Sequence, residues 1–505
     1  MLDLKNKKVL VFGLGILGGG VEAVKWFYKN KAKIKITDLK SKKYLFSSLK
    51  KLSNIKAKYI LGKHRYEDID WSDIVYVNPG VSYKNPFVEY AFKGKKEVVN
   101  DCYLFFKYAK GEIIAITGTR GKTTTITWVC ELLKRFFNDS DLKNFLKFKP
   151  NKKILIGGNQ PNRSLFKILE KTNSESISVL EVSSFQLEFY KKGIKAPKIA
   201  VITGLLNDHL NRYSNMAEYA RAKANIFLNQ TKNDFLILNY DNSWTNYFLS
   251  LKPKSQVYFV SSKKLPSKMN GIYFKKDVFY IRDKKEMKFF SLNGFKDSYG
   301  EHNVLNLLFS ILTVYLYLKN VFEIEFYKFS LQFKEFLSKN IFSLKTPSFR
   351  QELVYKSKFL EIINDSASTT PDATLAALRR YAKKKLVIIT GGTDKKLDFK
   401  NLAKQFKKQI DPQNCFLLNG TATQKFILEL KKNNYQLEEK NICEDLKECV
   451  IKVLKRAKEL RNKDKKGKIF VLFSPASASF EKFKNEFDRG KKFNKLIKYF
   501  FKISS

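Results

Sequence analysis

The sequence predicts an α/β protein of three domains whose sheets are mostly parallel. Short apolar runs such as Val9–Phe12 and Ile113–Ile116 recur along the chain, and many end in turns rich in Gly, Ser, Thr or Asp before a helical pattern begins. This alternation is typical of parallel strands that are connected by helices. The chain has 505 residues, which is enough for about three domains.

The three expected domains differ in their sequence signals. We expect an N-terminal Rossmann-like domain over residues 1–110, a central P-loop ATPase-like domain over 111–345 and a C-terminal Rossmann-like domain over 346–505. The segment Lys345–Ser348 is a credible linker before the last of these. Residues 240–300 alternate between strand-like segments and turns.

Composition limits the class of protein. Apolar residues make up 44% of the chain, and the five cysteines form no CxxC pair, which favours a reducing compartment. Gly13 and Gly15 interrupt the apolar run near the N-terminus, so it does not match a secretory signal. The longest apolar stretch, Val304–Leu318, is short for a bilayer span. We therefore expect a cytoplasmic protein without membrane insertion.

The net charge of +48 is the most extreme feature of the composition. A basic chain can bind nucleic acid through phosphate contacts. Lysine is scattered from end to end, however, which indicates a bias acting on all surface positions and not a focused patch. A basic nucleic-acid-binding protein is thus an alternative that the sequence does not favour, while an anionic substrate would still benefit from the field.

The first hundred residues carry a nucleotide-binding pattern. The strand Val9–Phe12 leads into the glycine-rich turn Gly13–Gly18 and a helix, and a second strand, Lys33–Thr37, ends at Asp38. In dinucleotide-binding folds, such glycines allow close phosphate approach and the acid binds a ribose. Alone, the pattern would suggest an NAD-dependent dehydrogenase, but the same architecture can hold any nucleotide diphosphate. A further strand, Ile74–Val77, ends in a turn that contains Gly80.

The segment Glu112–Thr125 predicts an ATP site. A buried strand is followed by a loop of the form GxxGKT, shorter than the full Walker pattern, and then by a helix that opens at Lys122. Backbone N–H groups of such a loop and the helix N-terminus attract phosphate. Lys122 can reach the β- and γ-phosphates, and the hydroxyl of Thr123 can hold Mg²⁺. An ordinary strand–turn–helix connection is the competing interpretation.

Two further strands of the central domain end in polar residues. The strand Ile177–Leu180 ends at Glu181, and the strand Ile199–Thr203 is followed by Asn207-Asp208-His209. Neighbouring strand ends near Thr123 make a plausible Mg²⁺ pocket, although Mg²⁺ prefers oxygen to imidazole nitrogen. A solvated carboxylate and a structurally satisfied histidine are the alternatives. The helical segment Tyr219–Phe227 contains Lys223, which periodicity does not distinguish from other lysines. A second helix is expected after His302, with Asn303 as a possible cap.

In the last domain, three strands each end in a Gly/Ser/Thr-rich turn. They are Phe359–Ile363, Val387–Ile389 and Ile469–Phe473. We expect a parallel sheet that presents these turns at one rim. The cations Lys395 and Arg489 and the hydroxyls of Thr369 and Ser479 could hold an amino-acid carboxylate there, although ordinary turns use similar residues.

Taken together, these segments resemble the Mur ligases, the ATP-dependent amino-acid-adding enzymes of peptidoglycan synthesis. The match runs from Val9 to Arg489 in the family's order. It is carried by GTRGKTTT, LEVSSFQLE, NDHLNRY, YARAKANIF, EHNVLN, INDSASTTPDAT and SPASASFEKFKN. The members that add D-glutamate match most closely.

The resemblance implies roles that spacing could not supply. Lys122, His209 and Lys223 would be catalytic, and Thr123, Glu181, His209 and Lys223 would serve the metals. Lys223 matches a lysine that is carbamylated in the family, and two Mg²⁺ ions are expected. The implied ATP-binding set is Gly118, Thr119, Arg120, Gly121, Lys122, Thr123, Thr124, Asn303, Asn306, Arg350 and Asp365. The implied substrate-binding set is Leu17, Asp38 and Gly80 for the UDP end, Asn159, Ser183 and Gln186 for the muramoyl part, and Thr369, Lys395 and Ser479 for the incoming glutamate.

The resemblance also implies the reaction. ATP would activate the carboxylate of UDP-N-acetylmuramoyl-L-alanine as an acyl phosphate, and the amine of D-glutamate would displace phosphate; a monomer is expected. The chain departs from the family pattern at four places. Arg120 replaces Asn, the segment Gly157–Asn162 lacks the usual Ile-Gly, Ala367 stands where Lys is common, and Glu486 where an aromatic is frequent. The last two leave open a relative that adds L-glutamate or another amino acid.

Overall fold

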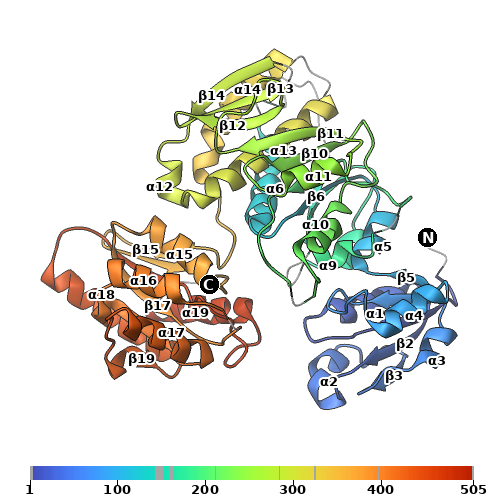
Figure 1. Cartoon of the computed structure of the whole chain (residues 1–505), viewed down its shortest axis with the longest axis horizontal. Helices are drawn as coiled ribbons and strands as arrows, with labels where there is room; N and C mark the ends of the chain where they lie inside the picture. The colour runs from blue at the N-terminus through green and yellow to red at the C-terminus, as the bar shows by residue number, and fades with distance from the viewer. Residues whose placement is uncertain are drawn as a thin grey trace. The chain divides into compact units, whose positions relative to one another are not determined.

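Three β-sheets organise the chain. Figure 1 shows the computed structural model, which describes residues 4–140, 142, 152–158, 163–190, 192–210, 212–283, 285–322, 326–395 and 397–502. The chain divides into two compact units, residues 1–293 with 305–344 and residues 294–304 with 345–505. The predicted fold class, mixed α/β with mostly parallel sheets, is confirmed. The domain boundaries at 110/111 and 345/346 stay predictions.

The first sheet is entirely parallel, with strand order β3-β2-β1-β4-β5. Its strands are β1 (Lys8–Phe12), β2 (Lys33–Asp38), β3 (Lys58–Leu61), β4 (Ile74–Val77) and β5 (Glu97–Val99). The helices of this region are α1 (Gly19–Lys29), α2 (Lys42–Lys50), α3 (Tyr66–Trp71), α4 (Pro86–Lys93) and α5 (Asp101–Tyr108). The sequence pattern does not predict β3 and β5, because β3 carries two exposed residues and β5 spans only three.

The second sheet has the order β14-β13-β12-β11-β10-β9-β6-β8-β7 and is parallel except at the hairpins β12–β13 and β13–β14. Its strands are β6 (Glu112–Thr117), β7 (Lys153–Gly158), β8 (Ser176–Glu181), β9 (Ile199–Ile202), β10 (Phe235–Asn239), β11 (Gln256–Ser261), β12 (Gly271–Lys275), β13 (Val278–Asp283) and β14 (Lys285–Ser291). Its helices are α6 (Lys122–Asn138), α8 (Leu165–Leu169), α9 (Ser184–Leu187), α10 (Met216–Ala224), α11 (Thr245–Ser250), α13 (His302–Phe322), α14 (Phe326–Asn340) and the 3-10 turn η1 (Ile341–Ser343).

The second unit contains the third sheet, with order β15-β16-β20-β17-β18-β19. Its strands are β15 (Glu352–Lys356), β16 (Leu360–Asn364), β17 (Lys385–Thr390), β18 (Cys415–Leu418), β19 (Ile442–Cys443) and β20 (Ile469–Phe473). Its helices are α12 (Phe295–Tyr299), α15 (Pro371–Arg380), α16 (Lys400–Gln409), α17 (Thr421–Lys432), α18 (Leu446–Lys463) and α19 (Glu486–Phe500), with 3-10 turns η2 (Pro412–Asn414) and η3 (Glu439–Asn441). Strands β16, β20 and β17 are adjacent and parallel, so the three predicted turns do share one rim.

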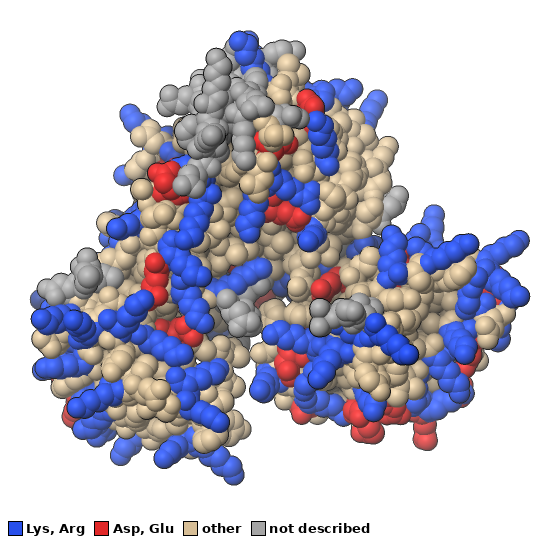
Figure 2. Space-filling view, turned by 180° about the vertical axis from the view of Figure 1, so that it is seen from behind, with Lys and Arg blue, Asp and Glu red and all other residues tan. Residues whose placement is uncertain are grey.

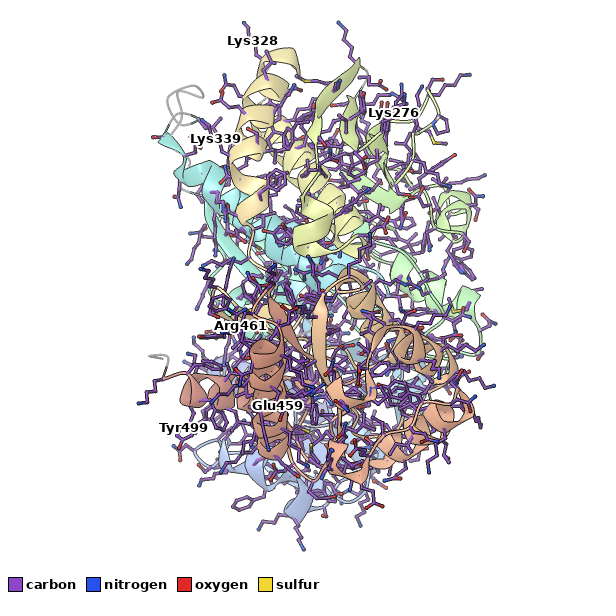
Figure 3. The ribbon with its side chains drawn as sticks, turned by 90° about the vertical axis from the view of Figure 1, so that its left-hand side faces the viewer. Lys276, Lys328, Lys339, Glu459, Arg461 and Tyr499 are labelled. Carbon is purple, nitrogen blue, oxygen red and sulfur yellow. The ribbon has the colours of Figure 1, made fainter. Side chains whose placement is uncertain are left out.

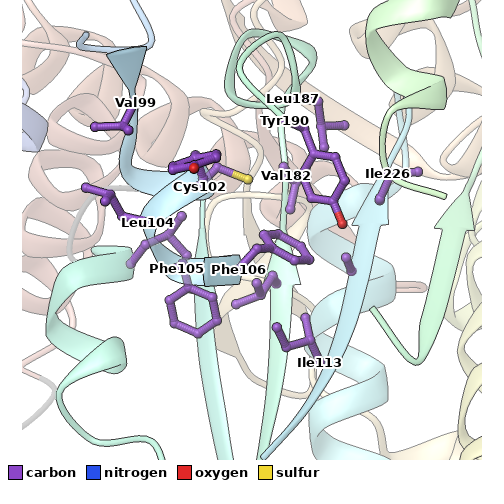
Figure 4. Close-up of a cluster of buried hydrophobic side chains, with 14 of the residues drawn as sticks. Val99, Cys102, Leu104, Phe105, Phe106, Ile113, Val182, Leu187, Tyr190 and Ile226 are labelled. Carbon is purple, nitrogen blue, oxygen red and sulfur yellow. The ribbon is translucent and has the colours of Figure 1, made fainter. Parts of the chain in front are cut away.

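A single hydrophobic cluster joins the first two sheets within the first unit. In Figure 4 it lies around α5, β6 and β8 and includes Phe105, Phe106, Ile113, Val182 and Tyr190. These side chains are all buried. Packing of α5 against this cluster therefore holds the N-terminal sheet beside the central one.

Helix α13 explains the longest apolar stretch. Within the described residues, its segment Asn303–Val321 is long and apolar enough to cross a membrane by length and composition, but 72% of that window is buried in the protein. Ser310 donates a hydrogen bond to the carbonyl of Thr125, and Tyr317 donates one to Glu112, so the helix packs beside α6 and β6. The sequence pattern predicts Asn303 as a possible cap, whereas the helix begins one residue earlier.

Lysine and arginine side chains are spread over the visible face in Figure 2 and do not gather in one patch. Lys276, Lys328 and Lys339, labelled in the upper part of Figure 3, are all exposed. This distribution agrees with the prediction that the charge reflects all surface positions.

Candidate functional site

The loop between β6 and α6 has the backbone of a phosphate-binding loop. Gly118 and Gly121 adopt φ of +144° and +85°, which side chains rarely tolerate. A Cβ at Gly118 would lie 2.0 Å from Oγ1 of Thr203, and one at Gly121 would lie 2.3 Å from Oδ1 of Asn306. Both positions therefore require glycine, and Asn306 lies against the loop as the resemblance implies.

Three hydrogen bonds fix the loop to the segment that follows β9. The amide of Thr119 donates to Gly204 at 2.9 Å, and its hydroxyl accepts from the amide of Leu206 at 3.0 Å. Thr203 donates its hydroxyl to the carbonyl of Arg120 at 2.6 Å. Arg120 thus contributes its backbone to the loop, a role that does not depend on its replacing Asn.

Lys122 folds back over its own loop. Its Nζ donates to the carbonyls of Gly118 at 2.8 Å and Thr119 at 3.1 Å. Lys122 is also the first residue of α6, a helix of 17 residues whose N-terminus carries a partial positive charge. A curled loop, a helix N-terminus and an ammonium group together fit a phosphate chain. Thr124, the third residue of α6, is buried behind the loop.

Thr123 and Glu181 are brought together as predicted. The hydroxyl of Thr123 donates to Oε2 of Glu181 at 2.9 Å, and both side chains are buried. The register explains this contact, since Glu181 at the end of β8 pairs with Ile116 of β6. A hydroxyl and a carboxylate are oxygen donors of the type that Mg²⁺ takes, alongside phosphates and water. Across the described residues, no group of three or more His, Cys, Asp and Glu side chains is arranged as a metal cage.

His209 lies in the strained loop after β9. Its φ is +56°, and its Nε2 is 3.8 Å from a carboxylate oxygen of Asp208. The ring meets Phe185 and Tyr219 edge to face at 4.8 and 5.7 Å between centroids. Burial lowers the pKa of His209, Asp208 opposes this shift, and the cations Lys223, Lys122 and Arg212 add to it. The imidazole is therefore held neutral among cations, which suits a metal ligand or a hydrogen-bond partner.

Among the described residues, Lys223 is the only lysine that is buried. Its Nζ donates to the carbonyl of Gly118 at 3.2 Å and lies 3.4 Å from Oγ1 of Thr117. It also lies 4.7 Å from the ring centroid of Tyr219. Burial lowers the pKa of Lys223 well below its usual value, and the nearby ammonium of Lys122 adds to this effect. Only the fold reveals this, because its sequence spacing is ordinary.

The residues predicted for the UDP end lie at the carboxyl edge of the first sheet. Asp38 accepts hydrogen bonds from the amides of Gly15 at 2.9 Å and Lys40 at 2.8 Å, so its carboxylate holds the glycine-rich turn. Leu17, in that turn, is 73% exposed. The amide of Gly80 donates to Asn78 at the end of β4. Leu17, Asp38 and Gly80 therefore lie on loops of the same edge.

Arg212 connects this edge to the central region, a role that the sequence pattern does not predict. Its guanidinium donates twice to Glu188, at 2.8 and 2.5 Å, and reaches the carbonyls of Gly80 and Val81 at 3.3 and 2.9 Å. Its position inside the motif NDHLNRY was the available signal. Arg212 thus ties the turn after β4 to α9.

The described residues that were predicted for the muramoyl part form hydrogen bonds within the protein. Ser183 caps α9, and Ser183 and Gln186 form a reciprocal capping box. Gln186 also donates to Asp101 at 3.0 Å, and burial raises the pKa of Asp101 to about 6. Asn159 lies outside the described residues.

The remaining nucleotide-contact predictions fall in the second unit. Asn303 donates to the carbonyl of Tyr299, and Arg350 is exposed. Asp365 is buried and accepts from the amide of Gln351 at 3.1 Å and the hydroxyl of Ser474 at 2.9 Å. Burial raises the pKa of Asp365 to about 7, although these hydrogen bonds and nearby arginines oppose it. A carboxyl group that is buried despite the cost of desolvating its charged form is a candidate functional group.

The rim of the third sheet carries the residues predicted for glutamate. A bridge between Thr393 and Ala478 joins the loops after β17 and β20, with both N–H···O distances at 3.1 Å. Lys395 is exposed and lies over the ring of Phe480. Thr369 is half-buried, and the hydroxyl of Ser479 is buried with no hydrogen-bond partner in the described part of the chain.

Arg489 donates its hydrogen bonds to the rim of the third sheet. The guanidinium is fully buried and donates to oxygens of Ser366, Ser477 and Ala478. The suggestion that this cation binds an amino acid directly is therefore wrong; it binds the rim itself.

Sequence comparisons connect the whole chain with known ligases. Residues 116–314 match the Mur ligase middle domain, and residues 7–100 match the Mur ligase MurD-like N-terminal domain. The UDP-N-acetylmuramoylalanine–D-glutamate ligase of Borreliella burgdorferi is 32% identical over 500 residues, with 98% of both chains covered. The enzyme of the same name from Clostridioides difficile is 33% identical over 494 residues, with 97% of this chain and 98% of the relative covered.

Solved structures share the fold at low identity. MurF from Acinetobacter baumannii superposes with a TM-score of 0.55 at 12% identity, covering 88% of both chains. A pseudomurein peptide ligase type C from Methanothermus fervidus gives 0.51 at 16% identity, covering 98% of this chain and 100% of that one. At these identities the likeness concerns the fold alone.

Proposed function

This chain belongs to the Mur ligase family, and on that premise we propose that it is an ATP-dependent ligase that adds D-glutamate to UDP-N-acetylmuramoyl-L-alanine. The reaction is a step in making peptidoglycan precursors, and hence in cell-wall growth and division. The observation that carries the proposal is full-length identity of 32–33% to relatives named for this activity. The phosphate loop and its contacts with Glu181, Lys223 and Asn306 support it independently.

The chemistry requires activation of a carboxylate, which is a poor electrophile. The substrate carboxylate attacks the terminal phosphoryl group of ATP, ADP leaves, and an acyl phosphate forms. The amine of glutamate then bonds to the acyl carbon and gives up a proton, and phosphate leaves with the C–O bond electrons. The ammonium group of Lys122 would leave the carbonyls of Gly118 and Thr119 and bind phosphoryl oxygens. There it would offset the negative charge that develops on those oxygens. The loop amides would hold the same phosphates.

The metal set is proposed from the oxygen donors around the loop. Mg²⁺, when bound, offsets the negative charge of the phosphates. Thr123 and Glu181 would hold one ion, and His209 with a carbamylated Lys223 would serve a second. Lys223 suits carbamylation because its buried amine is held neutral and so can add CO₂, and the resulting anion would lie near Lys122.

The substrate would extend from the loop to the first sheet. We propose that the uridine diphosphate end lies at Leu17, Asp38 and Gly80, and the muramoyl part near Asn159, Ser183 and Gln186. Arg212, which joins the turn at Gly80 to α9, would set the distance between these two subsites. Asn303, Arg350 and Asp365 would contact the nucleotide, and we propose a monomer that works in the cytoplasm.

A second candidate keeps the chemistry and changes the amino acid. Thr369, Lys395 and Ser479 would hold the incoming glutamate, but Ala367 and Glu486 depart from the residues common in D-glutamate enzymes. An L-glutamate ligase, or one for another amino acid, is therefore the alternative. A dehydrogenase or a nucleic-acid-binding protein would leave the phosphate loop without a role.

A panel of amino acids tests both candidates. Purified protein with ATP, Mg²⁺ and UDP-N-acetylmuramoyl-L-alanine should release phosphate with D-glutamate and much less with L-glutamate or other amino acids. Lys122→Ala should reduce that release by about 100-fold or more, because one charge-stabilising donor is worth that much in such sites. Lys134→Ala, exposed on the same helix, is the control and should behave as wild type. Absence of amino-acid-dependent phosphate release across the panel would refute the ligase assignment.

A further inference from the structure

Helix α19 is bound to the rim of the third sheet by buried hydrogen bonds near its N-terminus. Asn364, at the end of β16, donates its side-chain amide to the carbonyl of Gly490 at 2.9 Å. Ser366 donates its hydroxyl to the carbonyl of Glu486 at 2.7 Å. These bonds place the first turns of α19 directly behind the turn that follows β16.

Arg489 extends this attachment to a second turn. Its Nε and one terminal nitrogen donate to the hydroxyl and the carbonyl of Ser366, at 3.2 and 2.9 Å. The terminal nitrogens also donate to the carbonyls of Ser477 at 3.0 Å and Ala478 at 2.9 Å, in the turn after β20. One side chain thus joins the ends of two neighbouring strands.

The bonded carbonyls lie beside the residues proposed for glutamate. Ala478 immediately precedes Ser479, whose buried hydroxyl has no hydrogen-bond partner among the described residues. The same Ala478 pairs with Thr393 in the turn that leads to Lys395. Ser366 lies three residues before Thr369 in the other turn. A shift of the guanidinium would therefore move all three proposed contact residues.

Stability alone is a poor explanation for this arrangement. A fully buried guanidinium costs desolvation energy, and here it is offset mainly by neutral oxygens, since the ion pairs of the described chain do not include Arg489. Apolar side chains would fill the space with less cost. Five N–H groups in a rigid plane, however, can fix two loops at once in a way that apolar packing cannot.

We infer that Arg489 is a positioning residue for the incoming amino acid: it holds the turns after β16 and β20 so that Thr369, Lys395 and Ser479 converge on one amino-acid substrate. This inference rests on the proposed ligase function. Arg489 contacts no substrate itself. Its loss should weaken use of the amino acid and leave the earlier transfer of phosphate to the sugar-nucleotide carboxylate largely intact.

Two variants and a substitute nucleophile separate these steps. Arg489→Lys keeps the charge with a single donor atom, and Arg489→Met keeps the length without donors. The Michaelis constant for D-glutamate should rise about tenfold or more in both, while those for ATP and UDP-N-acetylmuramoyl-L-alanine should stay within about twofold. Hydroxylamine can capture an acyl phosphate without an amino-acid site, so hydroxylamine-dependent phosphate release should be near wild type in Arg489→Lys.

A control on the same helix accounts for general destabilisation. Phe493 lies one turn further along α19 and stacks on Phe473 at 4.6 Å between ring centroids, and its apolar side chain makes none of the rim hydrogen bonds. Phe493→Leu should lower the melting temperature without a selective effect on D-glutamate. Equal losses with D-glutamate and hydroxylamine in Arg489→Lys, or the same selectivity in Phe493→Leu, would overturn the inference. Wild-type protein that releases no phosphate with any amino acid would instead refute the proposed function.

Discussion

Single side chains decide most of the proposed chemistry, and Lys223 is the sharpest case. Its amine is buried against the phosphate loop, where an ammonium is unfavourable and a carbamate would face Lys122. We predict that Lys223→Ala lowers phosphate release by about 100-fold and that added formate or acetate restores part of it, because a free carboxylate can replace the carbamate. The measurement is turnover against carboxylate concentration.

Lys122→Ala is the matched control for that rescue. It removes a cation from the same loop, so an added anion should not restore its activity. Wild-type rates from Lys223→Ala without carboxylate would exclude a carbamate at this position.

Asp365 has a buried carboxyl group whose ionisation lowers the stability of the folded chain. Its pKa is raised to about 7 in the folded chain from an ordinary value of 3.8, mainly by burial. The folded state therefore binds the proton more tightly, and this contribution to stability is full below pH 4 and is lost as pH rises through about 7. We predict that Asp365→Asn stabilises the second unit by roughly 1–4 kcal/mol at pH 8 but lowers ligase activity.

Calorimetry of the full chain at pH 8 and pH 4 measures the effect. The advantage of Asp365→Asn should shrink at the lower pH, where wild type no longer ionises the group. Asp372→Asn, in the exposed first turn of α15, is the control and should show no such pH-dependent gain. A gain that is equal at both pH values would contradict this account.

Spacing alone predicts some of these residues, and family motifs supply the others. The spacing predicts Glu181 at a strand end near Thr123. The register of β6 and β8 brings the two side chains together, in agreement with that prediction. Lys223 has no such signal, because its burial depends on how α10 packs. Arg489 was misassigned for the same reason, since its charge is visible in sequence but its buried partners are not.

At the scale of elements, two glycines with the same backbone angle, one in the phosphate loop and one outside it, differ in what a side chain would meet. Gly121 and Gly193 share a φ of +85°, but a Cβ at Gly121 would lie 2.3 Å from Asn306, whereas one at Gly193 would meet no described atom within 4 Å. We predict that Ala at either position lowers stability by about 1 kcal/mol through backbone strain. Only Gly121→Ala should also lose phosphate release, by about tenfold or more, because Asn306 and the loop must separate.

Thermal melting and turnover of the two variants provide the comparison. Similar melting shifts with a turnover loss confined to Gly121→Ala are expected. Wild-type turnover and ATP affinity in Gly121→Ala would show that the contact with Asn306 does not shape the loop.

Elements were predicted best where both faces of a strand are buried. The runs at β1, β4, β6, β9 and β20 are apolar throughout, and each was located within a residue or two. Strands β3 and β5 were missed because they are short or partly exposed at the edge of their sheet. The predicted helix over Tyr219–Phe227 ends at Ala224, since the following residues close as turns whose amides bond three residues back.

For the whole molecule, the charge of +48 has a physical consequence even without a partner. Like charges spread over a surface repel one another and destabilise the compact state until salt screens them. Lys404 and Lys408 illustrate this, because they are exposed four residues apart on α16. Stability should therefore rise with ionic strength, although salt weakens exposed ion pairs.

A variant with fewer cations tests this directly. The exposed lysines to replace with Gln, all in the second unit, are Lys404, Lys408, Lys447, Lys455 and Lys458. At about 0.02 M salt, where the Debye length exceeds 20 Å, the variant should melt at a higher temperature than wild type by about 2 °C or more. At about 1 M salt, where that length is near 3 Å, the two should converge. If both proteins showed the same dependence of melting temperature on salt, removing five cations would have left the repulsion unchanged. Local ion pairs, and not the summed charge, would then set the response to salt.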